Sequence, residues 1–286
     1  MNTLKKYIYL IFLKFNHYFQ VLYFFYLSSG SFIILFQSYI ILERYYNDNY
    51  HRFFCLLIFL CGFVSFLICS LSDSGKICNS YLDKHFKYYP YDEIIFHENS
   101  ECETCKIKKP ARSKHCKYCS SCISRYDHHC FLLNNCIGGY NKVYFLIFIY
   151  VNIVITFYSS YITSLSLCSV IKYENLFNVT FINKETNKVL SNSYLTIAKY
   201  LFSEYSATFS LFIISFFSFF CILVFFLSEI YYSFCVNLTN YEKKKYNKLK
   251  NSLHINKNFY NKGLIKNVND VLFYKKNIED FLKKSS

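Results

Sequence analysis

Four long runs of uncharged, mainly apolar residues constrain this chain more than any other feature of its sequence. The runs cover residues 18–42, 53–71, 143–171 and 205–228, which are 25, 19, 29 and 24 residues long. A helix needs about 20 apolar residues to cross the ~30 Å hydrocarbon core of a bilayer. Buried helices of a soluble protein would instead carry charges every few residues on a solvent-facing side. The sequence therefore predicts an all-α integral membrane protein with four transmembrane helices.

Positive charges fall unevenly on the segments between these runs. Lys and Arg number three in residues 1–17, eleven in 72–142 and twelve in 237–286, against two in 43–52 and four in 172–204. Because Lys and Arg accumulate on the cytosolic side, both termini and residues 72–142 are predicted to be cytosolic. The net charge of +14 then reflects this bias and suits anionic lipid headgroups, so no nucleic-acid partner is expected. The apolar stretch at residues 8–13 is short and lacks a small-residue cleavage site, so no signal peptide is expected.

The runs and loops divide the chain into four predicted segments. Residues 1–71 hold the N-terminal segment and transmembrane helices 1 and 2, and residues 72–142 form a cytosolic cysteine-rich zinc domain between helices 2 and 3. Residues 143–236 hold helices 3 and 4 with a non-cytosolic loop, and residues 237–286 form a basic cytosolic tail. The side of the membrane matters because it decides how the cysteines are interpreted.

The loop between helices 2 and 3 concentrates potential metal ligands. Residues 102–136 contain seven cysteines and three histidines in the pattern C-x2-C-x9-H-C-x2-C-x2-C-x6-H-C-x5-C. In the reducing cytosol such a cluster favours metal binding or catalysis over disulfides. A structural zinc ion takes four ligands, and paired C-x2-C steps direct two thiolates at one ion. Two zinc sites would therefore use eight of these residues and leave two without a metal.

This loop resembles the cysteine-rich domain of the DHHC protein S-acyltransferases, or palmitoyltransferases. The resemblance rests on Asp127-His128-His129-Cys130, on residues 109–116, and on Asn134, Asn135, Cys136, Gly138 and Asn141. Three further stretches occur in the family's order. They are residues 72–75 (the family has Asp-Pro-Gly), residues 239–242 (Thr-Thr-x-Glu), and residues 258–267, which resemble a C-terminal motif of aromatic and asparagine residues.

The resemblance implies a role for each potential ligand. One structural Zn²⁺ would be held by Cys102, Cys105, His115 and Cys122, and a second by Cys116, Cys119, His129 and Cys136. The two residues left over are His128 and Cys130. Cys130 would be the nucleophile, His128 the base that accepts its proton, and Asp127 the carboxylate that orients the imidazole.

The expected function is then that of a protein S-palmitoyltransferase. An acyl group would move from a long-chain acyl-CoA, such as palmitoyl-CoA, to Cys130 and on to a cysteine of a membrane-apposed substrate protein. Two alternatives stay open: a zinc-braced binding scaffold without turnover, and a membrane-anchored zinc-domain ubiquitin ligase. Phe131-Leu132 favours the scaffold, because the family usually has Pro-Trp after the cysteine. The sequence names neither the substrate proteins nor an accessory subunit.

A few residues outside these patterns carry smaller expectations. Cys78 is a candidate for a free or acylated juxtamembrane thiol, and His85 and His97 are expected to be polar surface residues. Residues 178–180 (Asn-Val-Thr) form a glycosylation sequon in the predicted non-cytosolic loop. Residues 283–286 (Lys-Lys-Ser-Ser) resemble a dilysine retrieval signal, which favours a membrane of the endoplasmic reticulum or Golgi.

Overall fold

The computed structural model describes residues 3–46, 50–77, 88–182, 188–253 and 258–285, so the expectations for Cys78 and His85 lie outside the described residues. The chain forms two compact units. Unit 1 consists of Met1–Leu22, Ser65–Phe148 and Phe225–Ser286, and unit 2 consists of Tyr23–Val64 and Ile149–Val224. The candidate site residues all belong to unit 1.

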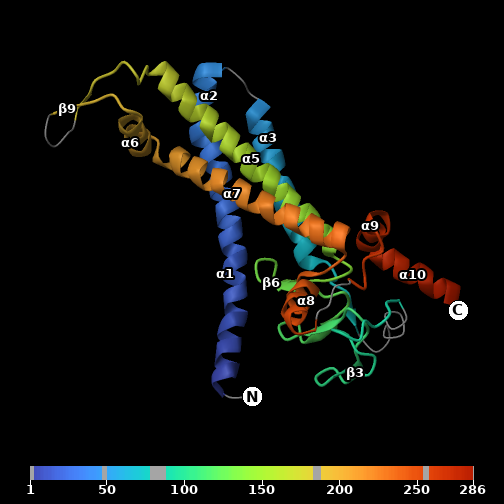
Figure 1. The fold of residues 1–286 in the computed structure, drawn as a ribbon. Coiled ribbons are helices and arrows are strands. Elements are labelled where there is room, and N and C mark those ends of the chain that lie inside the picture. The colour runs from blue at the N-terminus through green and yellow to red at the C-terminus, as the bar shows by residue number, and fades with distance from the viewer. Residues whose placement is uncertain (1–2, 47–49, 78–87, 183–187, 254–257, 286) are drawn as a thin grey trace. The chain divides into compact units, whose positions relative to one another are not determined.

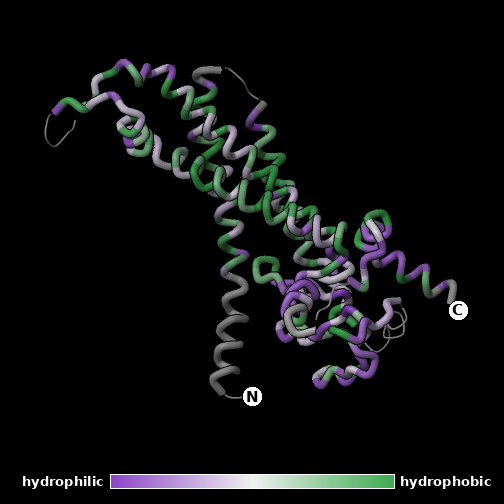
Figure 2. The backbone as a smooth tube through the Cα atoms, in the orientation of Figure 1, coloured by the Kyte–Doolittle hydropathy of each residue, from purple (hydrophilic) through white to green (hydrophobic). Residues whose placement is uncertain are grey.

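Four helical spans among the described residues are long and apolar enough to cross a membrane, as the four runs predict (Figure 1). They cover Tyr18–Glu43, His51–Leu71, Lys142–Tyr173 and Ser206–Val236. Their tubes are mostly green to white in Figure 2, whereas the tube of α8 is largely purple. The elements that form them are α1 (Thr3–Ile33), the π-helical turn η1 (Ile34–Ser38), α2 (Tyr39–Tyr46), α3 (Tyr50–Leu71), α5 (Lys142–Tyr173), α7 (Ser206–Ile230) and the π-helical turn η3 (Tyr231–Val236).

In unit 2, parts of these spans pack through small and apolar side chains. A Cβ atom at Gly62 would lie 2.8 Å from Ile155, so glycine permits the close approach of α3 to α5. The loop after α5 contains a short hairpin, β8 (Phe181–Ile182) with β9 (Val189–Leu190), and helix α6 (Tyr194–Glu204). Asn178 of the sequon is exposed. One buried cluster joins the spans and consists of Ile34, Leu42, Cys55, Ile162 and Leu211.

In unit 1 the described part of the cysteine-rich segment, residues 72–77 and 88–141, is built from short antiparallel strands and turns. The three-stranded sheet has the order β1-β5-β4, and two separate hairpins are β2–β3 and β6–β7. The prediction of an all-α protein is therefore wrong for this segment, because closely spaced ligands require tight turns that a helix does not provide. The strands are β1 (Lys76–Ile77), β2 (Glu101–Cys102), β3 (Ile107–Lys108), β4 (Lys114–Cys116), β5 (Ser121–Ile123), β6 (His128–Cys130) and β7 (Asn135–Ile137).

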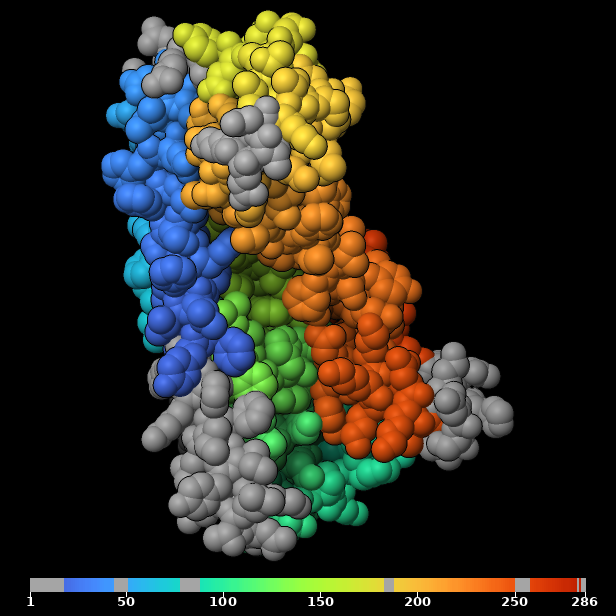
Figure 3. Space-filling view, turned by 90° about the vertical axis from the view of Figure 1, so that its left-hand side faces the viewer, coloured from blue at the N-terminus to red at the C-terminus, as the bar shows by residue number. Residues whose placement is uncertain are grey.

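The C-terminal part of unit 1 packs back on the cysteine-rich segment. It contains α8 (Asn240–Leu253), α9 (Leu264–Leu272) and α10 (Tyr274–Ser285). Figure 3 shows its orange-red atoms against the teal and green atoms of the cysteine-rich segment. A largely aromatic core joins the two parts and consists of Tyr89, Phe96, Ala111, Tyr260, Tyr274 and Ile278.

Arg112 and Glu242 form a buried ion pair at this junction. The guanidinium donates from Nε and Nη2 to the two carboxylate oxygens of Glu242, both at 2.7 Å, and neither side chain is exposed. Arg112 also donates to the side chain and the carbonyl oxygen of Asn237, at 3.2 and 2.9 Å. A buried ion pair is stable only when its remaining hydrogen bonds are made, and here Asn237 makes them. The stretch at residues 239–242 is thereby fixed beside the cysteine-rich segment.

Candidate active site and metal groups

Three hairpins of the cysteine-rich segment have the same turn. The first strands of these hairpins end at Cys102, Cys116 and Cys130, which are spaced by 14 residues. The fourth residue after each cysteine has left-handed backbone; these residues are Lys106, Ser120 and Asn134, with φ of 55°, 50° and 48°. The shared turn means that the three hairpins can be compared position by position.

The first predicted set of metal ligands meets at the first two hairpins. Nδ1 of His115 lies 3.5 Å from Sγ of Cys102, 3.3 Å from that of Cys105 and 4.0 Å from that of Cys122. The four ligand atoms all lie within 4.8 Å of one another. A tetrahedral zinc ion, with bonds of about 2.3 Å to sulfur and about 2.0 Å to nitrogen, holds such atoms about 3.6 Å apart. The group therefore fits a zinc ion bound by three thiolates and one imidazole.

The second predicted set meets between the second and third hairpins. Nδ1 of His129 lies 3.7 Å from Sγ of Cys116 and 3.5 Å from those of Cys119 and Cys136. The Sγ atoms of Cys119 and Cys136 are 3.4 Å apart. The other ring nitrogen of His129, Nε2, is buried without a hydrogen-bond partner among the described residues. The ring therefore presents Nδ1 to the three sulfurs, and this group also fits a zinc ion.

The third hairpin starts like the other two but belongs to neither metal group. Cys130 takes the place of Cys102 and Cys116, whereas Leu133, which is completely buried, takes the place of the second cysteine. The hairpin is fastened to the end of α3 by hydrogen bonds. Ser70 Oγ donates to the Leu133 carbonyl at 2.6 Å, and Asn135 Nδ2 donates to the Ser72 carbonyl at 2.8 Å. Protein contacts thus hold the hairpin of Cys130, and this residue is partly exposed.

His128 connects Cys130 to Asp127. Its Nδ1 atom lies 3.2 Å from Oδ2 of Asp127, and Cys130 lies two residues after it on the same face of strand β6. Burial alone would lower the pKa of His128, but its interactions with Asp127 and Cys130 raise it to about 9. Burial alone would raise the pKa of Asp127, but the Lys142 cation and the hydrogen bond from His128 hold it well below its ordinary value. A thiol, an imidazole and an ionised carboxylate therefore lie in sequence, as nucleophilic catalysis requires.

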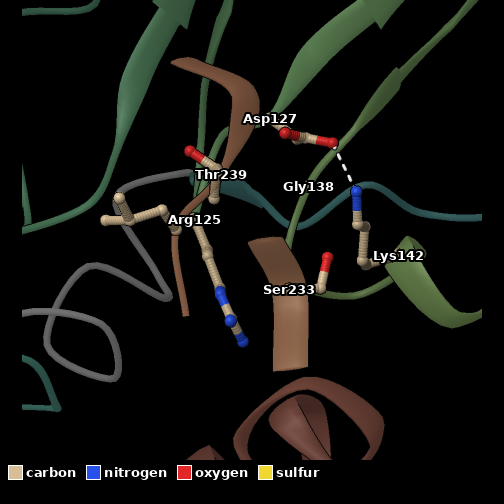
Figure 4. A pocket seen from close by; sticks show the side chains of 7 residues that line it. Arg125, Asp127, Gly138, Lys142, Ser233 and Thr239 are labelled. Atoms are coloured by element: carbon tan, nitrogen blue, oxygen red, sulfur yellow. Dashed lines mark hydrogen bonds and ion pairs between the residues drawn. The ribbon is translucent and has the colours of Figure 1, made fainter. Parts of the chain in front are cut away.

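The carboxylate of Asp127 is itself held on both oxygens. Lys142 Nζ donates to Oδ2 at 2.7 Å, and the backbone N–H of Asn240 donates to Oδ1 at 2.5 Å. Figure 4 shows the ion pair between Asp127 and Lys142, which both line a small cavity of about 10 Å³, about enough for one water molecule. The cavity is lined by Arg125, Asp127, Gly138, Lys142, Ser233, Leu238 and Thr239.

Comparison with known proteins identifies the family. A profile of the DHHC palmitoyltransferase family matches residues 95–247, which is more than half of the chain. The chain belongs to this family. Similar DHHC relatives include palmitoyltransferase SWF1 of Neurospora crassa, 41% identical over 108 residues, which are 38% of this chain and 25% of that protein.

Two further relatives match a shorter part of this chain. Palmitoyltransferase swf1 of Emericella nidulans is 56% identical over 81 residues, which are 28% of this chain and 20% of that protein. Palmitoyltransferase ZDHHC4 of Rattus norvegicus is 39% identical over 83 residues, 29% of this chain and 24% of that protein. The chain thus matches only a quarter or less of the length of these curated relatives.

The departure from the usual DHHC pattern after Cys130 has a structural counterpart. Phe131 packs its ring edge-on against Tyr118 and His129, with centroids 5.0 and 5.3 Å away. An aromatic side chain therefore covers the imidazole of the second metal group, although the chain lacks Pro-Trp here. Phe131 and Leu132 are both partly exposed.

Some DHHC site residues were predicted from the sequence and others were missed. The structure brings together both sets of four ligands and the group Asp127, His128 and Cys130, while His97 is exposed and lies 3.1 Å from Glu93. Lys142 and Glu229 were missed. A signal for them exists, because these two charges flank the third and fourth uncharged runs on the side predicted to face the cytosol.

Proposed function

We propose that this chain is a protein S-palmitoyltransferase that works through an acyl-Cys130 intermediate. The observation that carries the proposal is a partly exposed cysteine outside both metal groups, on the same strand face as a histidine that bonds to a buried, ionised aspartate. A zinc ligand would be coordinated and less nucleophilic, so its separation from the metal groups is what makes Cys130 available. Family membership supports the same reaction.

The reaction consists of two thioester exchanges. His128 accepts the proton of Cys130, whose thiolate attacks the carbonyl carbon of a long-chain acyl-CoA, preferably palmitoyl-CoA. The bond from that carbon to the CoA sulfur breaks, and CoA leaves with the proton from His128. A substrate cysteine then gives its proton to His128 and attacks the acyl-Cys130 carbonyl as a thiolate. The bond from that carbon to Cys130 Sγ breaks, and Cys130 regains its thiol proton from His128. Asp127, Lys142 and Glu229 together carry one net negative charge, which favours the imidazolium formed in between.

Zinc would act as a structural brace in this proposal. Each group consists of protein ligands only, three cysteines and one histidine, which is the composition of closed structural sites. The second group includes His129, which is flanked by His128 and Cys130 in β6. Occupation of this group therefore fixes the strand that carries the base and the nucleophile.

The membrane arrangement is a second part of the proposal. Both termini and residues 72–142 face the cytosol, residues 172–204 face the other side, and Cys130 lies at the cytosolic interface with the acyl chain among the spans. Lys and Arg of the cytosolic face contact the CoA phosphates, and substrates are membrane-apposed proteins with accessible cysteines.

Protease treatment of sealed microsomes tests this arrangement. The protease is expected to cut the loop at residues 102–136 and the tail, and to spare residues 172–204, because the positive charges lie in the former. Permeabilising the vesicles should expose the spared loop. Protection of the tail in intact vesicles would refute an even number of spans with a cytosolic N-terminus.

The two alternatives account for fewer observations. A zinc-braced scaffold requires no metal-free thiol beside a histidine and a buried aspartate. A zinc-domain ubiquitin ligase would use the two metal groups but leaves Asp127, His128 and Cys130 without a role. The alternatives are separated from the proposal by acyl-enzyme formation and by ubiquitin transfer, respectively.

Acyl labelling tests the proposed function directly. Purified protein in detergent is incubated with a clickable palmitoyl-CoA analogue, and the label is expected on Cys130 and to be released by neutral hydroxylamine. Cys130→Ser is expected to abolish the label, because a serine hydroxyl is far less acidic than a thiol. Cys235→Ser, which removes an exposed cysteine near the end of the fourth span, is the matched control and should label normally. Equal labelling of Cys130→Ser and the unaltered chain would overturn the proposal.

A further inference from the structure

Lys142 and Glu229 place two charges in a buried position next to the catalytic group. Lys142 is the first residue of α5, and Glu229 lies in the last turn of α7. Their side chains are only 11% and 5% exposed. A buried charge is costly unless it is paired and hydrogen-bonded, so the surroundings of both side chains show what they are paired with.

The two side chains close a ring of contacts around Asp127. Lys142 Nζ donates to Asp127 Oδ2 at 2.7 Å and to Glu229 Oε2 at 2.5 Å. On the other side Asn240 donates from its side chain to Glu229 Oε1 at 2.7 Å and from its backbone to Asp127 Oδ1 at 2.5 Å. The carboxylate of Asp127 is therefore fixed at both oxygens by two groups that Glu229 in turn connects.

We infer that Lys142 and Glu229 are positioning residues for acyl transfer: they hold the Asp127 carboxylate in the orientation that His128 needs to serve Cys130. The inference rests on the proposed function. Within the described part of the chain, the side-chain hydrogen bonds and ion pairs of the two residues go to Asp127, Asn240 and each other. Asp127 Oδ2 bonds to both Lys142 and His128, so a carboxylate released by Lys142 could rotate away from the imidazole. Misplacement of a catalytic group by about 1 Å can cost about 10²-fold in rate.

Substitutions of Lys142 and of Glu229 are expected to slow acyl labelling to different extents. Lys142→Met leaves the carboxylates of Asp127 and Glu229 without their shared cation, so repulsion disturbs Asp127. Glu229→Gln keeps the shape and the acceptor oxygen but removes one charge, so its effect should be smaller. Adding Glu229→Gln to Lys142→Met should restore part of the lost rate, because it removes the repulsion that the first change created.

The test is a double-mutant cycle on the rate of Cys130 acyl labelling in a single turnover. The chains compared are the unaltered protein, Lys142→Met, Asp127→Asn and the double variant, each checked for zinc content and melting temperature. Lys142→Met is expected to label about 10- to 100-fold more slowly with zinc retained. In the Asp127→Asn background the same change should have almost no further effect, because residues that act through one another are not additive. Lys172→Met, at the exposed far end of α5, is the matched control and should label normally.

Each outcome decides the inference. Multiplicative losses in the double variant, or an unchanged rate in Lys142→Met with zinc retained, would overturn it. If Lys142→Met loses zinc or aggregates, the same cycle with Glu229→Gln in place of Lys142→Met decides between the two outcomes, with Lys142→Arg expected to label faster than any neutral variant. An unaltered chain that does not label at all refutes the proposed function, whereas normal labelling with an additive cycle refutes the positioning role alone.

Discussion

The second and third hairpins of the cysteine-rich segment share a turn but are held in different ways. In the β4–β5 hairpin the first strand ends at Cys116, Cys119 follows three residues later, and both thiols belong to a metal group. In the β6–β7 hairpin the first strand ends at Cys130, and the residue three positions later is Leu133, whose carbonyl accepts from Ser70. One hairpin is fastened by ligands to an ion, and the other by apolar burial and hydrogen bonds.

The difference shows how a metal-binding frame can present a free thiol. The turn directs the first cysteine of each hairpin in the same manner, so Cys130 has the backbone setting of a zinc ligand. Leu133 fills the position that the second cysteine has in the other hairpins. His128, the first residue of β6, bonds to Asp127. A thiol in a rigid hairpin without an ion is thus available for nucleophilic chemistry. The comparison predicts that equivalent substitutions in the two hairpins differ in kind.

The largest contrast is expected between Cys116→Ala and Cys130→Ser. Cys116→Ala removes a ligand of the second metal group, and structural zinc contributes folding free energy of order 10 kcal/mol in small domains. It should therefore lose about one zinc per chain and the folded cysteine-rich segment. Cys130→Ser should keep both ions and its melting temperature. Elemental analysis measures the zinc content, and thermal unfolding measures the melting temperature. Zinc loss in Cys130→Ser would mean that Cys130 is a metal ligand and not the nucleophile.

The next contrast lies between two neighbouring histidines. His128→Ala removes the base and should slow acyl labelling by about 10²–10⁴-fold while zinc is retained. His129→Ala removes the nitrogen that faces three sulfurs, so it should lower the zinc content and destabilise the segment. Labelling rates and zinc analysis on the same preparations provide the measurement. Equal loss of zinc in the two variants would contradict the assignment of His129 as a metal ligand and of His128 as the base.

Leu133→Ala tests what replaces the ion in the third hairpin. Leu133 is completely buried, so its truncation leaves a cavity and should cost about 2–5 kcal/mol of unfolding free energy. Its neighbour Leu132 is partly exposed, and Leu132→Ala is the matched control with a smaller expected loss. Denaturant unfolding of zinc-loaded protein measures both. Equal losses would mean that burial of Leu133 does not hold the hairpin.

The sequence predicts the parts of this molecule that depend on spacing along the chain. The lengths of the uncharged runs predict the four spans. The spacing of cysteines and histidines matches a family pattern that predicts the two sets of ligands, which the structure brings together. The short strands were missed because two or three residues carry no detectable alternation. Lys142 and Glu229 were missed because they are 87 residues apart, and a charge at the end of a span ordinarily faces water or headgroups.

The smallest effect is expected at the turn that serves both kinds of hairpin, residues 72–75. Ser72 accepts from Asn135 of the third hairpin, and β1, which follows the turn, pairs with β5 of the second. Asp73 Oδ1 accepts from the Gly75 N–H at 2.9 Å, as in an Asx turn. Gly75 has φ of 87°, which suits the third residue of a type II turn and leaves Ser74 at the position that favours proline.

Ser74→Pro should therefore stabilise the turn that the DHHC pattern usually builds with proline. The pyrrolidine ring of proline restricts the unfolded chain, which should raise the free energy of unfolding by about 0.4–1 kcal/mol. The change also removes the Ser74 hydroxyl, which is buried without a partner among the described residues. Ser74→Ala removes the hydroxyl alone, so the difference between the two melting temperatures isolates the backbone effect. A lower melting temperature for Ser74→Pro than for Ser74→Ala would mean that Ser74 does not have the backbone angles of proline. A higher one would mean that Ser74 already has the backbone angles of proline, so that proline restricts only the unfolded chain and the turn keeps the geometry of the proline-containing DHHC pattern.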